Sequence, residues 1–553
     1  MKKTHWLTPL GAVLILALGL LVSPGCAMIK ATQLAGEGNR LVQQNQLDEA
    51  VAKFQESLEL NDNDAAHAGL AEAYLKIGRF SEAEEEAKKA IELSEGSLDK
   101  NTDRYHLILA RAYLLQNNGR DAWEHAERVV RMYYDTVLAD PTSRRLVKEG
   151  LLLKIRIIEA TGSPQQAEEQ ANQEGIQLKF ANDLDFEAER AVILALQHRN
   201  DEALAKADAV LAKQPDDGDA QLAKGIVYAT TGKVEEAKET LAKPLRDDPT
   251  RVLVMLQCTR ELRVAQKNDE AVELLNLLKE IQPQNHLIHK ELAFAFIDLQ
   301  RYEESIVEHE ALLKTYPSLV PYTSAKTLDE YKKALEEHPP SDFDAKELSG
   351  YYENLGSLYM QTGNVDAAIE CLERSLAARP NQRAYQALAG AYDRKEMYDK
   401  AIETLKRSLE LDPENPDILS ALGTIYFKAG NAEKATEALR ASIEGRMDDP
   451  EAHLNLGVVF FNSGQYKDAI EQFEAVTKLS PDNAEAYYYL GVAQFKNEEK
   501  KAAEASFLRC IELDKTYADA YRYLGNLAIE RKDYRKAKQY FANEDKYKGR
   551  TAQ

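Results

Sequence analysis

The chain has 553 residues, so it is too long for one hydrophobic core, and several domains or an extended repeat array are the starting options. Apolar residues make up 44% of it and glycine and proline are modest, which favours folded helices and argues against disorder except at the ends. The formal net charge of -22 would repel a phosphate backbone, so nucleic acid is not expected as a partner.

The first residues have the pattern of an export signal. Lys2 and Lys3 precede an apolar stretch of 13 residues, 10–22. This stretch is shorter than the ~20 residues that a membrane-spanning helix needs, and it fits the apolar region of a signal peptide. We therefore expect residues 1–25 to be a signal peptide and the protein to be exported.

The segment that follows contains a candidate lipidation site. Gly25 and Cys26 resemble the bacterial lipobox, in which a small residue precedes the cysteine that receives the lipid, whereas Ser23 and Pro24 depart from it. The resemblance implies lipidation of Cys26, with cleavage after Ala27 or an uncleaved anchor as the alternatives. Because more than one acyl chain anchors a protein stably, we expect the body of the lipoprotein to lie in the periplasm, held at the outer membrane.

From residue 31 the chain is predicted to form successive pairs of helices. Units begin near residues 31, 64 and 103, and a degenerate pair follows between 146 and 178. In that pair Gly162 ends one helix, and Ser163 and Pro164 provide an N-cap and a first-turn proline for the next. Four further units begin near residues 184, 218, 252 and 286, and each ends at a proline: Pro215, Pro249, Pro283 and Pro317.

Residues 318–348 interrupt this rhythm. Pro321, Pro339 and Pro340 flank a stretch with helical character at 325–337. Prolines end helices because they lack the backbone N–H and clash with the preceding turn. We expect either an irregular helical joint between two arrays or a decayed repeat.

Six more units begin near residues 349, 382, 416, 450, 484 and 518, with a period of 34 residues. In the last four, a Leu-Gly pair is followed at fixed intervals by an alanine and then by a large apolar residue. The pairs are Leu422-Gly423, Leu456-Gly457, Leu490-Gly491 and Leu524-Gly525, the alanines are Ala435, Ala469, Ala503 and Ala537, and the large residues are Leu439, Phe473, Phe507 and Phe541.

This pattern resembles the tetratricopeptide repeat, a pair of helices A and B with small residues at positions 8 and 20 of each unit and a large residue at position 24. The resemblance implies an all-α solenoid of about 14 repeats wound as a right-handed superhelix with a long concave face. It would comprise an array at 26–317, the joint at 318–348, six repeats at 349–545 and a tail at 546–553.

The sequence offers no convincing catalytic or metal site. His67, His106, His289 and His453 all fall at position 4 of their units, the slot that tryptophan fills in the family, so we expect them to pack in the core. His286 lies one turn from His289, but no third ligand at a fitting spacing accompanies them. Since repeats occupy nearly the entire chain, we expect no catalytic domain, no metal and no cofactor.

Position 12 of helix A is the candidate binding strip. It holds Phe427, Phe461 and Phe495 in three consecutive units and Ile529 in the next, and Tyr488 lies nearby at position 5. If this face lines the groove, these side chains form an apolar strip for a partner. The alternative is that position 12 packs against the neighbouring helix.

The resemblance to lipoproteins of this repeat class implies a non-enzymatic scaffold of the bacterial cell envelope. Its partners would be envelope assembly or secretion proteins, bound as extended segments in the groove, and its lipid would attach it to a membrane. The alternative is a carbohydrate-binding or assembly component of a polysaccharide-export or cell-wall machine.

Overall fold

A computed structural model describes residues 24–95, 101–134, 140–177, 180 and 183–548, and every regular element in these ranges is an α-helix or a short 3₁₀ helix. The chain divides into two compact units, unit 1 (Met1–Ser324) and unit 2 (Ala325–Gln553). Unit 1 contains α2 (Pro24–Gln43), α3 (Leu47–Leu60), α4 (Asp64–Ile77), α5 (Phe80–Ser94), α6 (Asn101–Leu115), α7 (Gly119–Tyr133), α8 (Pro141–Thr161), α9 (Pro164–Gln177), α10 (Leu184–Leu196), α11 (Asn200–Leu211), α12 (Gly218–Thr230), α13 (Val234–Asp247), η1 (Pro249–Arg251), α14 (Val252–Val264), α15 (Asn268–Ile281), α16 (His286–Asp298), α17 (Tyr302–Thr315), η2 (Pro317–Leu319) and α18 (Val320–Thr323).

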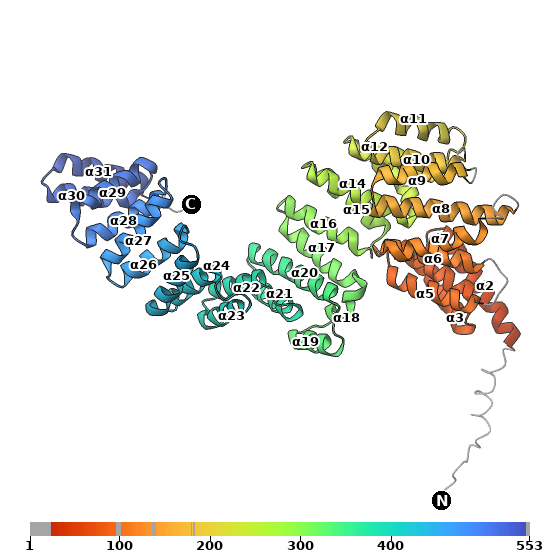
Figure 1. Ribbon diagram of the computed structural model, residues 1–553, viewed down its shortest axis with the longest axis horizontal. Coiled ribbons are helices and arrows are strands. Elements are labelled where there is room, and N and C mark those ends of the chain that lie inside the picture. The colour runs from red at the N-terminus through yellow and green to blue at the C-terminus, as the bar shows by residue number, and fades with distance from the viewer. Residues whose placement is uncertain (1–23, 96–100, 135–139, 178–179, 181–182, 549–553) are drawn as a thin grey trace, which may run out of the picture. The chain divides into compact units, whose positions relative to one another are not determined.

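Unit 2 is also built from packed helices. It contains α19 (Leu328–Glu337), α20 (Asp342–Gln361), α21 (Val365–Ala378), α22 (Gln382–Arg394), α23 (Tyr398–Leu411), α24 (Pro416–Lys428), α25 (Ala432–Gly445), α26 (Pro450–Asn462), α27 (Tyr466–Leu479), α28 (Ala484–Lys496), α29 (Lys500–Leu513), α30 (Ala518–Glu530) and α31 (Tyr534–Tyr547). Apart from α18 and α19, the described helices form consecutive helix–turn–helix pairs, eight in unit 1 and six in unit 2 (Figure 1). The predicted all-α repeat architecture is confirmed.

In seven of these pairs a glycine on helix A accepts a large side chain from helix B. A Cβ atom placed on Gly457 would lie 2.6 Å from the ring of Phe473, and one on Gly491 would lie 2.7 Å from the ring of Phe507. Both rings are fully buried. A side chain at the glycine would force the two helices apart, and this explains the fixed Gly-to-Phe interval in the sequence.

The turn between helix A and helix B has the same backbone in almost every pair. Thirteen of these turns contain one residue with a positive φ. That residue is glycine in five turns, whereas the other eight carry a side chain, as at Glu498 (φ 65°) and Lys532 (φ 64°). A side chain in the left-handed region costs energy, so the repeat geometry imposes this conformation against local preference.

The division between the units falls within the predicted joint at 318–348. There α19 packs on α21 through Tyr331, which is fully buried, with its ring edge-on to Tyr352 at 5.5 Å. The Arg374 guanidinium lies over both rings and donates to the carbonyl of Ala325 at 3.1 Å. Helix α20 then begins seven residues earlier than the unit predicted near residue 349, because Ser341 caps its first turn.

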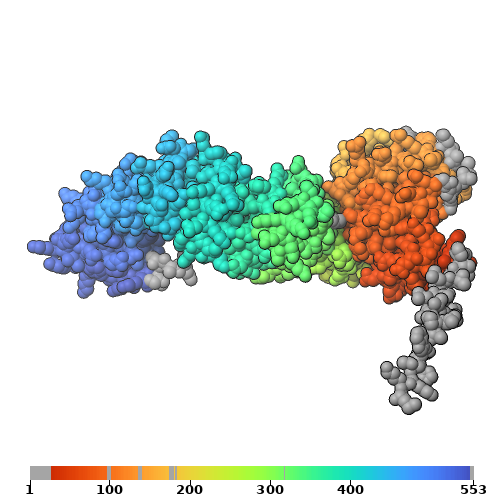
Figure 2. Space-filling model, turned by 90° about the horizontal axis from the view of Figure 1, so that it is seen from below, coloured from red at the N-terminus to blue at the C-terminus, as the bar shows by residue number. Residues whose placement is uncertain are grey.

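Within unit 1 the array turns back on itself. At the end of α4, Lys76 donates to the carbonyl of Arg246 at 2.7 Å, and the carbonyl of Ile77 accepts from the backbone of Gln284 at 3.3 Å. Leu253 of α14 packs against apolar clusters built from helices α2 to α8. In Figures 1 and 2 the yellow-green segment that contains α14 accordingly lies beside the orange helices of the same unit.

Candidate functional site: the helix A face of unit 2

A hollow of about 380 Å³ lies on the helix A side of unit 2, over α22, α24 and α26. Its walls come from positions 2, 5, 9 and 12 of successive helices A: Gln386, Gly390 and Asp393 on α22, Asp417, Ser420 and Thr424 on α24, and Glu451 on α26. A Cβ atom on Gly390 would meet no atom within 4 Å. The face that contains position 12 is therefore open to a ligand in this part of the array.

The polar groups of this hollow are partly paired with one another. Arg446 donates to Asp417 at 2.6 Å and to Asp449 at 2.5 Å, and these bonds raise the pKa of the Arg446 guanidinium. Although burial opposes the charge, Arg446 holds the pKa of Asp449 below its usual range. Lys428 bonds to Asp393 at 2.6 Å. The hollow is thus polar and acidic where it faces α22 and α24.

The predicted strip occupies the corresponding positions further along the array. Phe427, Phe461 and Phe495 are each half-buried, and each rests against an apolar core cluster. Ile529 is 45% exposed. Each of these Phe side chains therefore packs partly against the core, as the alternative interpretation predicted, while part of it stays accessible.

Tyr488 lies in an aromatic cluster with the next repeat. Its ring centroid is 4.9 Å from that of Tyr517 and 6.3 Å from that of Tyr523, and Tyr523 contacts Phe495 at 5.4 Å. Burial raises the pKa of Tyr488 to about 12, so the phenol stays neutral at physiological pH. Tyr488 is joined to the strip through Tyr523, a residue that the sequence did not single out.

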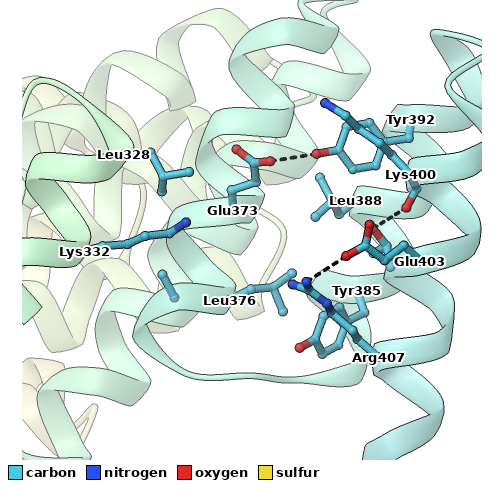
Figure 3. A pocket seen from close by; sticks show the side chains of 12 residues that line it. Leu328, Lys332, Glu373, Leu376, Tyr385, Leu388, Tyr392, Lys400, Glu403 and Arg407 are labelled. Carbon is cyan, nitrogen blue, oxygen red and sulfur yellow. Dashed lines mark hydrogen bonds and ion pairs between the residues drawn. The ribbon is translucent and has the colours of Figure 1, made fainter.

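A second hollow of about 360 Å³ lies between α19, α21, α22 and α23. Figure 3 shows Lys332, Glu373, Tyr392 and Arg407 converging on it. Tyr392 donates to Glu373 at 2.7 Å, and Arg407 donates to Glu403 at 2.7 Å. Because helices B contribute much of its wall and its polar groups bond within it, we place the candidate site on the helix A face instead.

In unit 1 the helix A positions carry a buried ion network that the sequence did not reveal. Arg251 is 1% exposed and donates to Glu159 at 3.2 Å, to Glu189 at 2.5 Å and to Asp219 at 3.0 Å. Arg156 bonds to Glu189 and Asp219 as well, at 3.2 and 2.8 Å. These residues come from four consecutive repeats, so the Arg251 side chain of η1 joins α8, α10 and α12.

The pKa values of two neighbouring carboxylates in this network shift in opposite directions. Burial and the neighbouring Glu189 raise the pKa of Glu159 well above its usual range. Despite its own burial, Glu189 has a lowered pKa because Arg251 and Arg156 stabilise its charge.

The four position-4 histidines each bond to a residue 19 positions later, on helix B of the same repeat. The pairs are His67 with Glu86, His106 with His125, His289 with Glu308 and His453 with Gln472. Burial lowers the pKa of His106 to about 4, since its partner is another imidazole. Among the described residues no group of three His, Cys, Asp or Glu side chains is arranged to hold a metal ion.

The cysteines and the amino terminus were also singled out from the sequence. Cys258 and Cys510 are buried, and burial raises both thiol pKa values to about 12. Helix α2 begins at Pro24, but the side chain of Cys26 and residues 1–23 of the signal peptide predicted at 1–25 lie outside the described part of the chain. None of the described helices is long and apolar enough to cross a membrane.

Family models agree with the helical pairs. Models described as tetratricopeptide repeats match residues 41–92, 347–414, 394–456, 457–498 and 484–517. A model described as the N-terminal tetratricopeptide repeat region of Psidin matches residues 193–322. No curated protein matches the chain.

Solved structures resemble parts of the array. MamA is 25% identical over 30% of this chain and 96% of its own, with a TM-score of 0.29. YrrB, described as a tetratricopeptide repeat protein with an unusual peptide-binding site, is 27% identical over 36% of this chain and 96% of its own, with a TM-score of 0.29. The pilF protein of Pseudomonas aeruginosa is 22% identical over 37% of this chain and 94% of its own, with a TM-score of 0.34.

Proposed function

Because the chain belongs to the tetratricopeptide repeat proteins, which bind other proteins, we propose that it is a non-enzymatic scaffold that holds an extended protein segment on the helix A face of unit 2. The observation that carries this proposal is the open hollow over α22, α24 and α26, lined by the same repeat positions that hold the aromatic strip. In unit 1, helix A residues of α8, α10 and α12 bond instead to the chain's own Arg251. Unit 2 is therefore the better candidate for partner binding.

The strip has the size that a moderate affinity requires. Fully burying a Phe side chain is worth about 1.5–3 kcal/mol, and a micromolar complex is worth about 8 kcal/mol. Because Phe427, Phe461 and Phe495 are already half-buried, each has only part of this energy left to gain. Three such residues together with backbone hydrogen bonds would support a micromolar complex, in which a few anchors dominate.

We propose that the scaffold works in the bacterial cell envelope, anchored by a lipid on Cys26. The support is the sequence alone: Lys2 and Lys3, the short apolar stretch and the Gly25-Cys26 pair. Metabolic labelling with a fatty-acid analogue should mark the wild-type protein and leave Cys26→Ala unlabelled. Equal labelling of both proteins, or labelling of neither, would remove the lipid anchor from the proposal.

Affinity capture from detergent-solubilised envelopes tests the groove. Wild-type protein should retain a defined partner that Phe461→Ala loses, while a matched change on helix B, Tyr534→Ala, should retain it. Tyr534 is 67% exposed and lies on α31, so its loss leaves the helix A face intact. Equal capture by the two variants, or capture of a polysaccharide without any protein, would contradict the proposal.

A further inference from the structure

One edge of the helix A face in unit 2 carries a carboxylate in each of four consecutive repeats, at position 2: Asp417, Glu451, Glu485 and Asp519. Two of these carboxylates form an ion pair with a nearby arginine. Arg446 bonds to Asp417 at 2.6 Å, and Arg522 pairs with Asp519 at 2.8 Å. Glu451 and Glu485 are both exposed, and neither forms an ion pair with another described residue of the chain. Of these four carboxylates, the two without an ion pair thus lie on α26 and α28.

These two helices also carry the most apolar part of the same face. On α26, Glu451 is followed at helical spacing by Leu454, Val458 and Phe461, which lie in one stripe. On α28 the corresponding stripe runs from Glu485 through Tyr488, Val492 and Phe495. A carboxylate without an ion pair therefore lies beside an apolar stripe in two adjacent repeats, and the Glu485 carboxylate accepts a hydrogen bond from Tyr489.

The opposite edge of the face is basic but largely occupied. Position 13 holds Arg394, Lys428 and Lys496 in their respective repeats. Arg394 donates to the carbonyl of Met360 at 2.9 Å, and Lys428 bonds to Asp393 at 2.6 Å. The charge left for a partner on α26 and α28 is therefore negative on one edge, with Lys496 alone on the other.

We infer that the segment bound by unit 2 is basic as well as apolar, with Lys or Arg side chains next to the apolar residues that enter the groove. This inference rests on the proposed function and adds the charge of the partner. Apolar side chains would cover the stripes of α26 and α28, while the neighbouring cations meet Glu451 and Glu485. Charge complementarity of this kind selects partners and speeds their association.

The repeat geometry sets the spacing of the pattern. Packed helices are separated by about 8–10 Å, and an extended chain advances about 3.3 Å per residue. One repeat therefore corresponds to about three residues of the bound segment. A partner would carry an apolar residue followed by a basic residue in each stretch of about three residues.

Synthetic peptides provide the probe. A short fluorescein-labelled peptide of repeating Leu-Lys-Ser is titrated with the full chain, and fluorescence anisotropy is compared with that of Leu-Gln-Ser and Leu-Glu-Ser peptides. Two exposed ion pairs predict that the Lys peptide binds about two- to thirtyfold more tightly than the Gln peptide, and the Glu peptide should bind most weakly. Equal binding of the Lys and Gln peptides would overturn the inference.

The variants assign the preference to specific carboxylates. Glu451→Gln combined with Glu485→Gln should remove the preference for lysine, whereas the same changes at Glu437 and Glu471, exposed on helices B, should preserve it. Because an acid in the first helical turn also stabilises the helix dipole, unfolding midpoints are recorded for every variant. A double variant that stays folded and still prefers the Lys peptide would refute the assignment.

Phe461→Ala separates the two proposals. If it weakens binding of all three peptides while the charge variants change nothing, binding in the groove is supported and only the basic character of the partner is refuted. If no peptide binds, or if binding ignores Phe461→Ala, the groove itself is wrong and the present inference fails with it.

Discussion

Replacing Arg251 by methionine tests whether the buried network holds unit 1 together. The change leaves Glu159, Glu189 and Asp219 in a buried site with only Arg156 beside them. Removing one partner of a buried ion pair costs about 3–5 kcal/mol, because the remaining charge keeps its desolvation cost and loses its attraction. We expect Arg251→Met to lower the unfolding free energy of unit 1 by about that amount.

The assay uses Trp123, which packs in unit 1 with Lys154 Nζ 4.6 Å from the ring centroid. In a Trp6→Phe background its fluorescence during urea unfolding reports unit 1 alone. The matched control is Arg199→Met, because the Arg199 and Glu202 side chains are 42% and 59% exposed and pair at 2.6 Å. An exposed pair contributes about 0–1 kcal/mol, so the control should change little. Similar small shifts for both variants would refute the account of the network.

Three further predictions concern stability. Phe473→Ala should cost about 3–5 kcal/mol because its ring is fully buried, and Phe461→Ala should cost clearly less; equal losses in urea unfolding would place position 12 in the core. Glu498→Gly should stabilise unit 2 by roughly 0.5–1 kcal/mol, since glycine relieves a φ of 65°, and a lower midpoint would contradict this. Burial lowers the pKa of His286 to about 3, so the neutral imidazole contributes fully to the free energy of unfolding above the pKa of the unfolded state, about 6.5. As the pH falls from there toward 3, the free energy of unfolding should decrease by about 1.4 kcal/mol per pH unit. His286→Phe should flatten this slope, and an unchanged slope would show that the imidazole titrates normally.

The repeat architecture could be predicted because its determinants lie within one unit. The interval between Gly457 and Phe473 recurs in the sequence, and the structure shows that ring packed on that glycine. The helix end at Gly162 and the N-cap at Ser163 could also be predicted, because both depend on a few neighbouring residues. In the structure the Ser163 hydroxyl accepts a hydrogen bond from the backbone N–H of Gln166 at 3.3 Å.

The buried network could not be predicted in the same way. Its charged residues are about one repeat apart in the sequence: Glu159, Glu189, Asp219 and Arg251. Within its own segment, each has the pattern of an ordinary solvent-exposed charge. Their burial follows from the accumulated rotation of successive repeats, which no local pattern encodes. Tyr488 illustrates the same limit, since its contacts depend on how the next repeat is placed.

Site-specific photocrosslinking identifies the face of unit 2 that contacts a partner. Benzoyl-phenylalanine is introduced in place of Phe461 on helix A and, separately, in place of Glu471, which is exposed on helix B of the same repeat. Irradiation of intact cells should join a defined protein partner to the chain from position 461 and not from position 471. Crosslinks from position 471 alone, or equally from both positions, would contradict binding on the helix A face.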